Sequence, residues 1–412
     1  MNIVIAGAGI AGLSAAETVR QLNPSANVII FSQERQLPYF RPRLPELVCG
    51  AVTTDKLFVR PEEWFNSNNL ELRKGERLVE ICLDNRQARG SLGSRLIFDR
   101  LLIATGASSF LPDAAKNFNL PGIFPVRSLM DAWNLNYATR SAKTSLLMGS
   151  GLLGLEIGHA LTKLGLSVHA LERSNRILPF QTTPQSSQIL QKALEAKGFV
   201  FHLESEAIKL EGQSHLERVL LSNGEALEVE LLIVAAGVSP NLELANSLNL
   251  KVERGIVVDQ YLETAIPGIY AAGDCAQTPD GKGGLWSIAR QEGIVAGRNM
   301  ALDDPLQRQA YVPIPPSSVL KVAGVDFIAA GNIDPEGKLP YAEYATESTY
   351  RKAVVNQLGV LTGFTNVGAT VGNRELGAAL NRQVAIPADV LAALGQPDFD
   401  FETLKGLSPP AA

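Results

Sequence analysis

Short apolar runs, separated by segments long enough to form a helix, set the pattern of the first two thirds of the chain. Residues 3–6 form the first run and residues 28–31 the next, with a glycine turn and a helical segment between them. The same succession returns with the runs 146–148 and 168–171. Apolar runs that alternate with helices are typical of parallel strands buried between helices. The pattern therefore predicts two strand–turn–helix–strand units in an α/β chain.

The turn after the first run has the spacing G-x-G-x-x-G, with Gly7, Gly9 and Gly12 at its three fixed positions. The first glycine permits a sharp turn, the second lets the backbone approach a pyrophosphate, and the third allows close packing of helix on strand. The following helix directs free N–H groups and the positive end of its dipole at the phosphates. Glu34 follows the second strand, where a carboxylate can accept hydrogen bonds from a ribose.

The second turn repeats this layout with Gly149, Gly151, Gly154 and the acidic residue Glu172. A single turn of this kind could be an ordinary strand–turn–helix crossing with incidental glycines. Two copies, each followed by a glutamate at the matching place, predict a protein that holds two dinucleotides at once. The usual reason for such an arrangement is the movement of electrons between them.

Three later apolar runs end in small residues, as a backbone does when it passes close to a ligand. Residues 98–104 run into Thr105 and Gly106, and residues 231–234 run towards Gly237. Residues 269–272 run into Gly273 and Asp274, with a long helix further on. The repeated endings indicate a duplicated architecture. Asp274 is predicted either to cap that helix or to bind a ligand, and both roles together are compatible with its position.

Composition adds mainly exclusions. The chain has 412 residues, 46% hydrophobic and 19% charged, with a net charge of −5, which gives no electrostatic reason to expect nucleic-acid or membrane binding. No apolar run reaches transmembrane length and the start lacks signal-peptide features, so we expect a cytoplasmic protein. The three cysteines form no close pair and the four histidines show no metal-ligand spacing, so neither a redox dithiol nor a metal site is expected. His159 is interpreted as a packing or surface residue.

Five segments in fixed order resemble the FAD-dependent pyridine-nucleotide oxidoreductases, the superfamily of glutathione and ferredoxin reductases. They are the first turn, residues 104–107, the second turn with Glu172, residues 236–237 and residues 270–274. The resemblance extends over nearly all of residues 1–385. Residues 37–44 and 320–326 resemble the branch of rubredoxin reductases and nitrite-reductase flavoproteins in particular.

The resemblance implies an α/β fold with two Rossmann-like nucleotide-binding domains, for FAD and NADH, and a small α+β C-terminal domain. The FAD domain would comprise residues 1–112 and 246–318, the NAD(P)H domain residues 113–245, and the C-terminal domain with a short tail residues 319–412. The FAD site implied by position consists of Gly7, Gly9, Ile10, Ala11, Gly12, Glu34, Arg41, Pro42, Ala104, Thr105, Gly106, Gly273, Asp274 and Trp286. The NADH site consists of Gly149, Gly151, Leu152, Leu153, Gly154 and Glu172, and Val79 and Gly237 are further predicted cofactor contacts. Trp286 fits a core position equally well.

Glu156 and Arg43 are the predicted catalytic residues. A carboxylate on an apolar helix face is costly to bury without a function, and the resemblance implies a place for Glu156 near the nicotinamide and flavin. Related ferredoxin reductases pair this glutamate with a lysine, but Glu46 occupies the approximate lysine position here. The expectation is that Arg43 takes over the pairing.

Two further features bear on chemistry. Relatives that reduce peroxide, oxygen or coenzyme A disulfide carry a redox cysteine where Pro42 falls, and Cys49 comes several residues later, so we interpret Cys49 as structural. Glu172 favours NADH by bonding its 2′-OH and repelling the 2′-phosphate of NADPH. Arg173 and Arg176 follow it and could soften that exclusion, which leaves NADPH as a possible second coenzyme.

The resulting hypothesis is an NADH-dependent FAD reductase that passes electrons to a small iron or iron–sulfur carrier, with rubredoxin first by resemblance. The enzyme alternatives are a ferredoxin reductase, a flavoprotein component of nitrite reduction, and an NADH oxidase or peroxidase acting through Cys49. An alternative of another class is a flavoprotein used for binding or signalling, which the acidic net charge and the lack of a basic tract disfavour.

Overall fold

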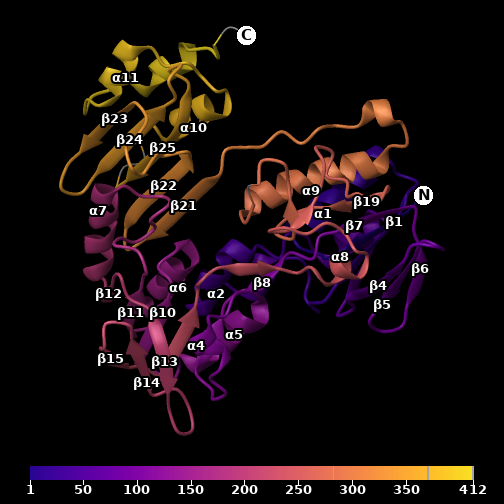
Figure 1. Cartoon of the computed structure of the whole chain (residues 1–412), viewed down its shortest axis with the longest axis horizontal. Coiled ribbons are helices and arrows are strands. Elements are labelled where there is room, and N and C mark those ends of the chain that lie inside the picture. The colour runs from indigo at the N-terminus through magenta and orange to yellow at the C-terminus, as the bar shows by residue number, and fades with distance from the viewer. Residues whose placement is uncertain (282, 369–370, 411–412) are drawn as a thin grey trace. The chain divides into compact units, whose positions relative to one another are not determined.

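The computed structural model describes residues 1–281, 283–368 and 371–410. The chain forms two compact units, which are treated separately below (Figure 1). The first unit comprises residues 1–42, 53–108 and 238–313, and the second comprises residues 43–52, 109–237 and 314–412. Among the described residues, no helix combines the length and the apolar character needed to cross a membrane.

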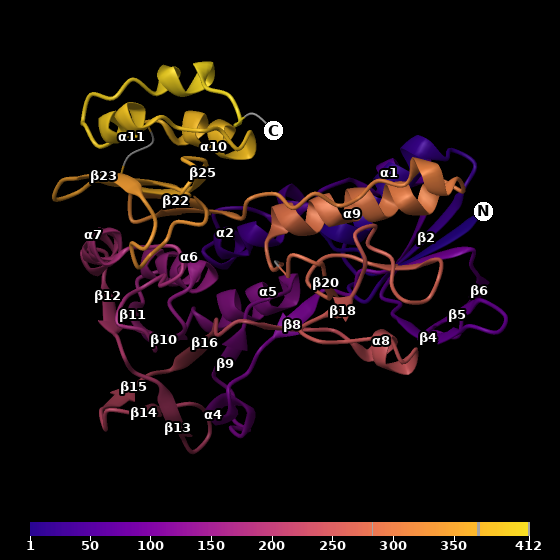
Figure 2. The ribbon, with the colours of Figure 1, turned by 45° about the horizontal axis from the view of Figure 1, so that its top comes forward.

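A five-stranded parallel sheet forms the centre of the first unit, in the order β19-β7-β1-β2-β3. Its strands are β1 (Asn2–Ala6), β2 (Asn27–Ser32), β3 (Leu70–Lys74), β7 (Arg100–Ile103) and β19 (Ile269–Ala271). Residues 3–6 and 28–31 are no more than 1% exposed, because this sheet is covered on both faces as their apolar sequence predicts. The helices α1 (Ile10–Leu22) and α9 (Trp286–Ala301) lie side by side against it (Figures 1 and 2).

Smaller elements complete the first unit. An antiparallel sheet consists of β4 (Leu78–Cys82), β5 (Gln87–Gly90) and β6 (Arg95–Ile97). The short helices are η1 (Arg41–Arg43, at the boundary), η2 (Thr54–Leu57), α3 (Glu62–Ser67), α8 (Glu243–Ser247) and η3 (Pro305–Gln307). Two strand pairs are β8 (Ala107–Ser109) with β17 (Val238–Pro240) and β18 (Ile256–Val257) with β20 (Ala276–Gln277). β8 follows β7 and β17 follows β16 (Leu231–Val234) along the chain, so this pairing brings together the segments that come after these two strands.

The second unit contains another five-stranded parallel sheet, in the order β12-β11-β10-β16-β9. Its strands are β9 (Ile123–Pro125), β10 (Thr144–Met148), β11 (Ser167–Leu171), β12 (Phe199–His202) and β16 (Leu231–Val234). The associated helices are α2 (Leu44–Val48), α4 (Asp113–Lys116), α5 (Leu129–Ala138), α6 (Leu152–Lys163) and α7 (Pro184–Glu195), with a hairpin sheet of β13 (Ala207–Glu211), β14 (Arg218–Leu221) and β15 (Ala226–Glu228). Capping boxes at Ser128 and Thr183 fix the starts of α5 and α7.

The last hundred residues add an antiparallel sheet to the second unit, in the order β21-β22-β25-β24-β23. Its strands are β21 (Ser317–Val322), β22 (Val325–Gly331), β23 (Tyr341–Ala345), β24 (Tyr350–Val355) and β25 (Leu361–Val367), followed by α10 (Asn373–Asn381), α11 (Ala388–Leu394) and η4 (Phe401–Gly406). Phe364, Leu376 and Leu404 form part of the buried core between sheet and helices. The α/β class with two Rossmann-like sheets and an α+β C-terminal part is confirmed.

Candidate functional site

The first glycine turn joins β1 to α1, and its three glycines have different surroundings. Gly7 has a φ of +118°, and a Cβ added there would lie 2.1 Å from the Ala104 carbonyl oxygen. A Cβ on Gly12 would lie 1.9 Å from the Gly7 oxygen, whereas a Cβ on Gly9 would meet nothing within 4 Å. Gly7 and Gly12 are thus required by packing, and Gly9 borders open space at the N-terminus of α1.

The second turn joins β10 to α6 and has the same geometry. A Cβ on Gly149 would lie 2.6 Å from the Ala235 carbonyl oxygen, and a Cβ on Gly154 would lie 2.3 Å from the Gly149 carbonyl oxygen. A Cβ on Gly151 would meet nothing within 4 Å. Neither Gly9 nor Gly151 caps its helix with a side chain, so the N–H groups of the first helical turns are available to a ligand. Ile10, Ala11, Leu152 and Leu153 form those first turns. Both turns fit a dinucleotide pyrophosphate, because a Cβ at the middle glycine would occupy the space the phosphates need.

Glu34 lies just beyond β2, as predicted, and its carboxylate is held by two neighbours. The Tyr39 hydroxyl donates to Oε2 at 2.7 Å and Arg41 Nη2 donates to Oε1 at 2.6 Å. Arg41 also stacks on the Tyr39 ring, 5.2 Å from its centroid. The loop that carries Arg41, a predicted FAD-site residue, therefore contacts Glu34 directly. Pro42, the next residue, is exposed.

The segments after β7 and β19 surround the same turn. Ala104 contacts Gly7 as described, and the following Thr105–Gly106 turn is tied to Asn241. Thr105 Oγ1 donates to Asn241 O at 2.9 Å, and Asn241 Nδ2 donates back to Thr105 O at 2.8 Å. The sequence did not single out Asn241 as a site residue, because nothing near it in the chain reveals a partner 136 positions away.

Gly273 follows β19 with a φ of +80°, and Asp274 is partly buried beside it. The prediction that Asp274 caps the long helix is wrong: α9 begins at Trp286 with Leu285 as its N-cap, and β20 lies between. The Glu292 side chain reaches back from α9 and accepts the Gly273 N–H at 2.6 Å. Burial, together with the charges of Asp274 and Asp280, raises the pKa of Glu292 to about 8.

Two other predicted contacts of the first unit lie in different surroundings. Trp286, the first residue of α9, packs against Phe40 with ring centroids 4.4 Å apart and ring planes tilted by 35°, so it adjoins the loop that carries Arg41. Val79 is partly buried on β4, in the small antiparallel sheet rather than the central one.

Glu172 lies at the end of β11 and is bonded to the second glycine turn. The hydroxyl of Ser150, inside that turn and fully buried, donates to Glu172 Oε2 at 2.6 Å, and the Ser174 N–H donates to Oε1 at 3.0 Å. The two arginines that follow are engaged elsewhere. Arg176 Nη2 donates to Pro179 O at 3.1 Å and to Glu336 at 3.3 Å, and Arg173 lies 3.9 Å from Glu206. Gly237, predicted as a further contact, is exposed with a φ of +104°.

Glu156 is partly buried on α6, and α2 packs against that helix. Burial and the negative charge of Glu46 raise the pKa of Glu156 to about 7. Arg43 donates to both carboxylate oxygens of Glu46, at 2.8 and 2.7 Å, and this holds the pKa of Glu46 below its usual value. Arg43 and Glu46 are three residues apart at the start of α2, a spacing that lets the two side chains meet. The expected pairing of Arg43 with Glu156 stays a prediction.

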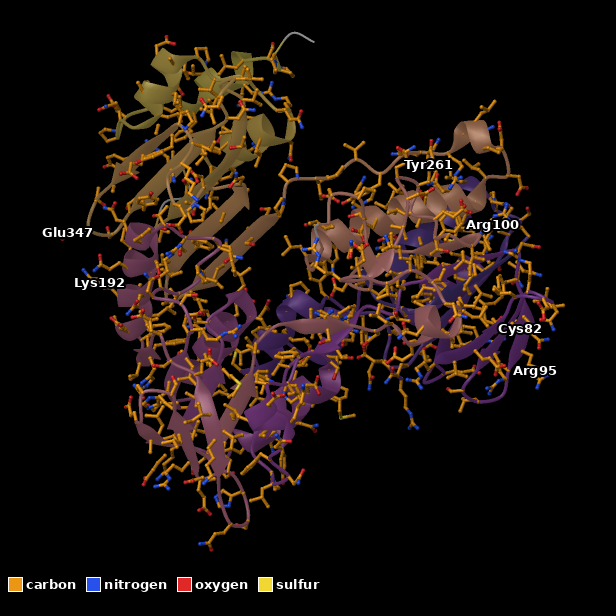
Figure 3. All side chains as sticks on the ribbon, in the orientation of Figure 1. Cys82, Arg95, Arg100, Lys192, Tyr261 and Glu347 are labelled. Atoms are coloured by element: carbon orange, nitrogen blue, oxygen red, sulfur yellow. The ribbon has the colours of Figure 1, made fainter. Side chains whose placement is uncertain are left out.

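The three cysteines are all free thiols. Cys49 follows α2, where its thiol donates to Glu46 O at 3.5 Å. Cys82 ends β4 of the first unit (Figure 3), and Cys275 is fully buried beside Asp274. His159, interpreted as a packing residue, accepts the Ala323 N–H at 3.3 Å and so joins α6 to the C-terminal sheet.

Comparison with known proteins identifies the family. The family model for "Pyridine nucleotide-disulphide oxidoreductase" matches residues 1–293. The rubredoxin-NAD(+) reductase of Pseudomonas putida is 32% identical over 278 residues, 67% of this chain and 72% of that protein. The assimilatory nitrate reductase electron transfer subunit of Bacillus subtilis is 30% identical over 86% of this chain, but the match spans only 46% of that relative.

The fold is shared with solved reductases as well. A ferredoxin reductase from Rhodopseudomonas palustris superposes with a TM-score of 0.87 over 98% of this chain and 99% of that one, at 24% identity. The chain therefore belongs to the pyridine nucleotide-disulphide oxidoreductase family and is a flavoprotein oxidoreductase that uses FAD and NAD(P)H.

Proposed function

We propose that this enzyme takes electrons from NADH onto FAD and passes them singly to a small iron-containing carrier, with rubredoxin as the acceptor. FAD supplies the acceptance of a hydride and the release of single electrons. The protein binds the two cofactors, aligns them for the transfer and excludes water from between them. The observation that supports this proposal most is the pair of glycine turns, each with an open middle glycine and a bonded glutamate.

Within the first unit, the N-terminus of α1 is assigned to the FAD pyrophosphate, because Gly9 leaves room there and the helix end is positive. Glu34 is assigned to the adenosine ribose, and its bonds with Tyr39 and Arg41 hold the carboxylate in one orientation. Trp286 and Phe40 are assigned to the wall of the flavin site, since both adjoin the Arg41 loop.

Within the second unit, the coenzyme is assigned to the N-terminus of α6, and Glu172 is assigned to the selection of NADH. Glu172 would accept the 2′-OH of the ribose and repel a 2′-phosphate. Arg176 is bonded to a carbonyl and a carboxylate, so it would have to give up those bonds to receive a phosphate. The Arg173 side chain is 78% exposed, so its charge is the one that could bind the 2′-phosphate of NADPH.

Glu156 is assigned to a place beside the nicotinamide, since it lies on the helix that begins at the second turn. Its pKa, raised to about 7, lets the Glu156 carboxyl group hold a proton near neutral pH. A neutral acid there can donate a hydrogen bond and leaves the negative charge of Glu46 to be balanced by Arg43.

Direct transfer from flavin to acceptor is favoured by the spacing of the cysteines. Cys49, Cys82 and Cys275 lie far apart in the sequence, so the chain has no closely spaced cysteine pair of the kind that a disulfide-reducing relay uses. One-electron iron carriers are acceptors that need no such relay, and the similarity to a rubredoxin-NAD(+) reductase supports rubredoxin among them. A cytoplasmic location stays a prediction.

The similarity to a nitrate reductase electron transfer subunit favours a second candidate, a flavoprotein component of a larger nitrogen-oxide reductase. To separate the candidates, NADH oxidation is measured with rubredoxin, with a [2Fe–2S] ferredoxin and with hydrogen peroxide, for wild type and Cys49→Ser. We expect rubredoxin to give the highest kcat/KM and Cys49→Ser to leave it unchanged, with Cys82→Ser as the matched control. Peroxide turnover that Cys49→Ser abolishes would contradict the proposal and support a thiol peroxidase.

A further inference from the structure

Glu292 is a buried carboxyl group that the proposed function does not use. It lies in the second turn of α9 with 2% of its surface exposed. Its Oε2 accepts the backbone N–H of Gly273 at 2.6 Å, across 19 positions of sequence. A carboxylate is costly to bury without a cation, so the presence of one beside a cofactor turn requires an explanation.

The surroundings of Glu292 place it at the junction of three elements. A Cβ on Gly273 would lie 3.0 Å from the Ala11 Cβ, and a Cβ on Gly293 would lie 2.2 Å from the Ala11 oxygen. The first turn of α1, the Gly273–Asp274 turn and α9 are therefore in contact around Ala11. Glu292 bonds the second of these elements from the third.

The ionisable groups that act on Glu292 are acidic. Asp274, on the turn that Glu292 holds, and Asp280, in the loop before α9, both raise its pKa, after the larger effect of burial. The Tyr311 phenol, 8% exposed, faces it from the segment after α9, and the charge of Glu292 in turn raises the Tyr311 pKa. A diphosphate at the N-terminus of α1 would add two negative charges to this group, and like charges in a buried site disfavour ionisation.

We propose that Glu292 is a positioning residue which admits FAD only as the neutral carboxylic acid, so that FAD binding is linked to the uptake of a proton. The inference rests on FAD lying at the first glycine turn, as in the proposed function. Binding of FAD to a protein with ionised Glu292 takes one proton from the solvent, and release of FAD returns it. Either form accepts the Gly273 N–H, so ionisation acts through charge rather than through loss of that bond.

The sign of the pH dependence follows from the raised pKa. Below the pKa of about 8 the acid is neutral and FAD is held. Above it the ionised form dominates, and the dissociation constant for FAD is expected to rise about tenfold per pH unit. Glu292→Gln keeps the size of the side chain and an acceptor oxygen for Gly273, so its dissociation constant should stay low and independent of pH.

The test uses the purified holoenzyme, diluted at pH values from about 6.5 to about 9.5, with released FAD measured by its fluorescence at equilibrium. Glu263→Gln is the matched control, because Glu263 also accepts a glycine N–H, from Gly268 at 2.7 Å, but is paired with Arg308. This variant should keep the wild-type pH dependence. Asp280→Asn removes a neighbouring charge, so the onset of FAD release should move to lower pH.

A wild-type dissociation constant that stays flat up to the highest pH, or a pH dependence that persists in Glu292→Gln, would overturn the inference. Failure of the proposed function gives a different result, since a purified protein without bound flavin absorbance, or one that holds flavin which NADH does not bleach, would refute the function itself. A yellow, NADH-reducible enzyme with a flat FAD affinity refutes only the role of Glu292.

Discussion

Among single residues, Glu156 makes the stability of the folded protein depend on pH. Its pKa in the folded protein is about 7, against a usual value of 4.5, so the folded state binds more protons than the unfolded state between these values. The stability contributed by the neutral acid is present below about pH 4.5 and is lost as the pH rises to about 7. Each pKa unit corresponds to about 1.4 kcal/mol.

We expect Glu156→Gln to remove this loss and to raise the free energy of unfolding by about 2 kcal/mol above pH 7, after allowance for partial solvent screening. Urea unfolding of both proteins at several pH values measures the difference. A stability difference that is the same at pH 5 and pH 8 would show that Glu156 does not titrate as described.

The neighbours of Glu156 should shift its pKa in opposite directions. Glu46→Gln removes the negative charge that raises the pKa of Glu156, and the pKa should fall. Arg43→Gln leaves Glu46 without the cation that bonds it, and the pKa of Glu156 should rise. Carbon-13 NMR titration of the glutamate carboxyl carbons checks both variants, and a shift in the same direction for the two would contradict the assigned roles.

Ser150 illustrates a residue that positions another. Its buried hydroxyl bonds Glu172, so Ser150→Ala should free the carboxylate and raise the KM for NADH about threefold to tenfold, with kcat little changed. Discrimination against NADPH should fall by a similar factor. Ser145→Ala is the matched control, since Ser145 is equally buried on β10 but donates to Ser167 O. Equal effects of the two substitutions would indicate a loss of packing only.

Among the structural elements, the first glycine turn contains one glycine that is expected to matter for FAD binding and another that is expected to matter for stability. Gly9 has an extended backbone, with φ −68° and ψ −178°, and open space at its Cβ position. Gly9→Ala should therefore fold normally and lose FAD affinity by about tenfold or more. Gly12→Ala would press a methyl group against the Gly7 oxygen and should cost about 3 kcal/mol of stability. Flavin content and the thermal midpoint distinguish the two, and equal flavin content in Gly9→Ala and wild type would contradict the assigned pyrophosphate site.

The parts of the site that the sequence revealed are those with a local signature. Both turns, their glutamates and the strands around them were predicted because glycine spacing and apolar runs are readable along the chain. Ser150 and Glu292 were not singled out as site residues, since each acts through a partner 22 or 19 positions away. The Asp274 cap was predicted wrongly because the pattern did not show the strand β20 and the loop that precede α9.

Arg43 bonds Glu46 across the start of α2, and its predicted pairing with Glu156 stays a prediction, because the positions of Arg43 and Glu156 in the chain do not reveal how far apart their side chains lie. The predicted domain boundaries at residues 112, 245 and 318 stay predictions. The structure divides the chain into two compact units and assigns residues 43–52 to the second.

For the whole molecule, we propose that FAD binds the first unit and NADH the second, and that reduced FAD passes electrons to a docked iron carrier without the help of a thiol. The division of the two glycine turns between the units supports this arrangement.

The central claim is tested by anaerobic stopped-flow mixing of the purified enzyme with NADH and then with oxidised rubredoxin. The account predicts rapid bleaching of the flavin by NADH, much slower bleaching by NADPH, and rapid re-oxidation of the flavin as rubredoxin is reduced, with the same rates in Cys49→Ser. Absence of flavin bleaching by NADH would contradict the assignment of the second glycine turn. Bleaching without any reduction of rubredoxin would contradict rubredoxin as the acceptor.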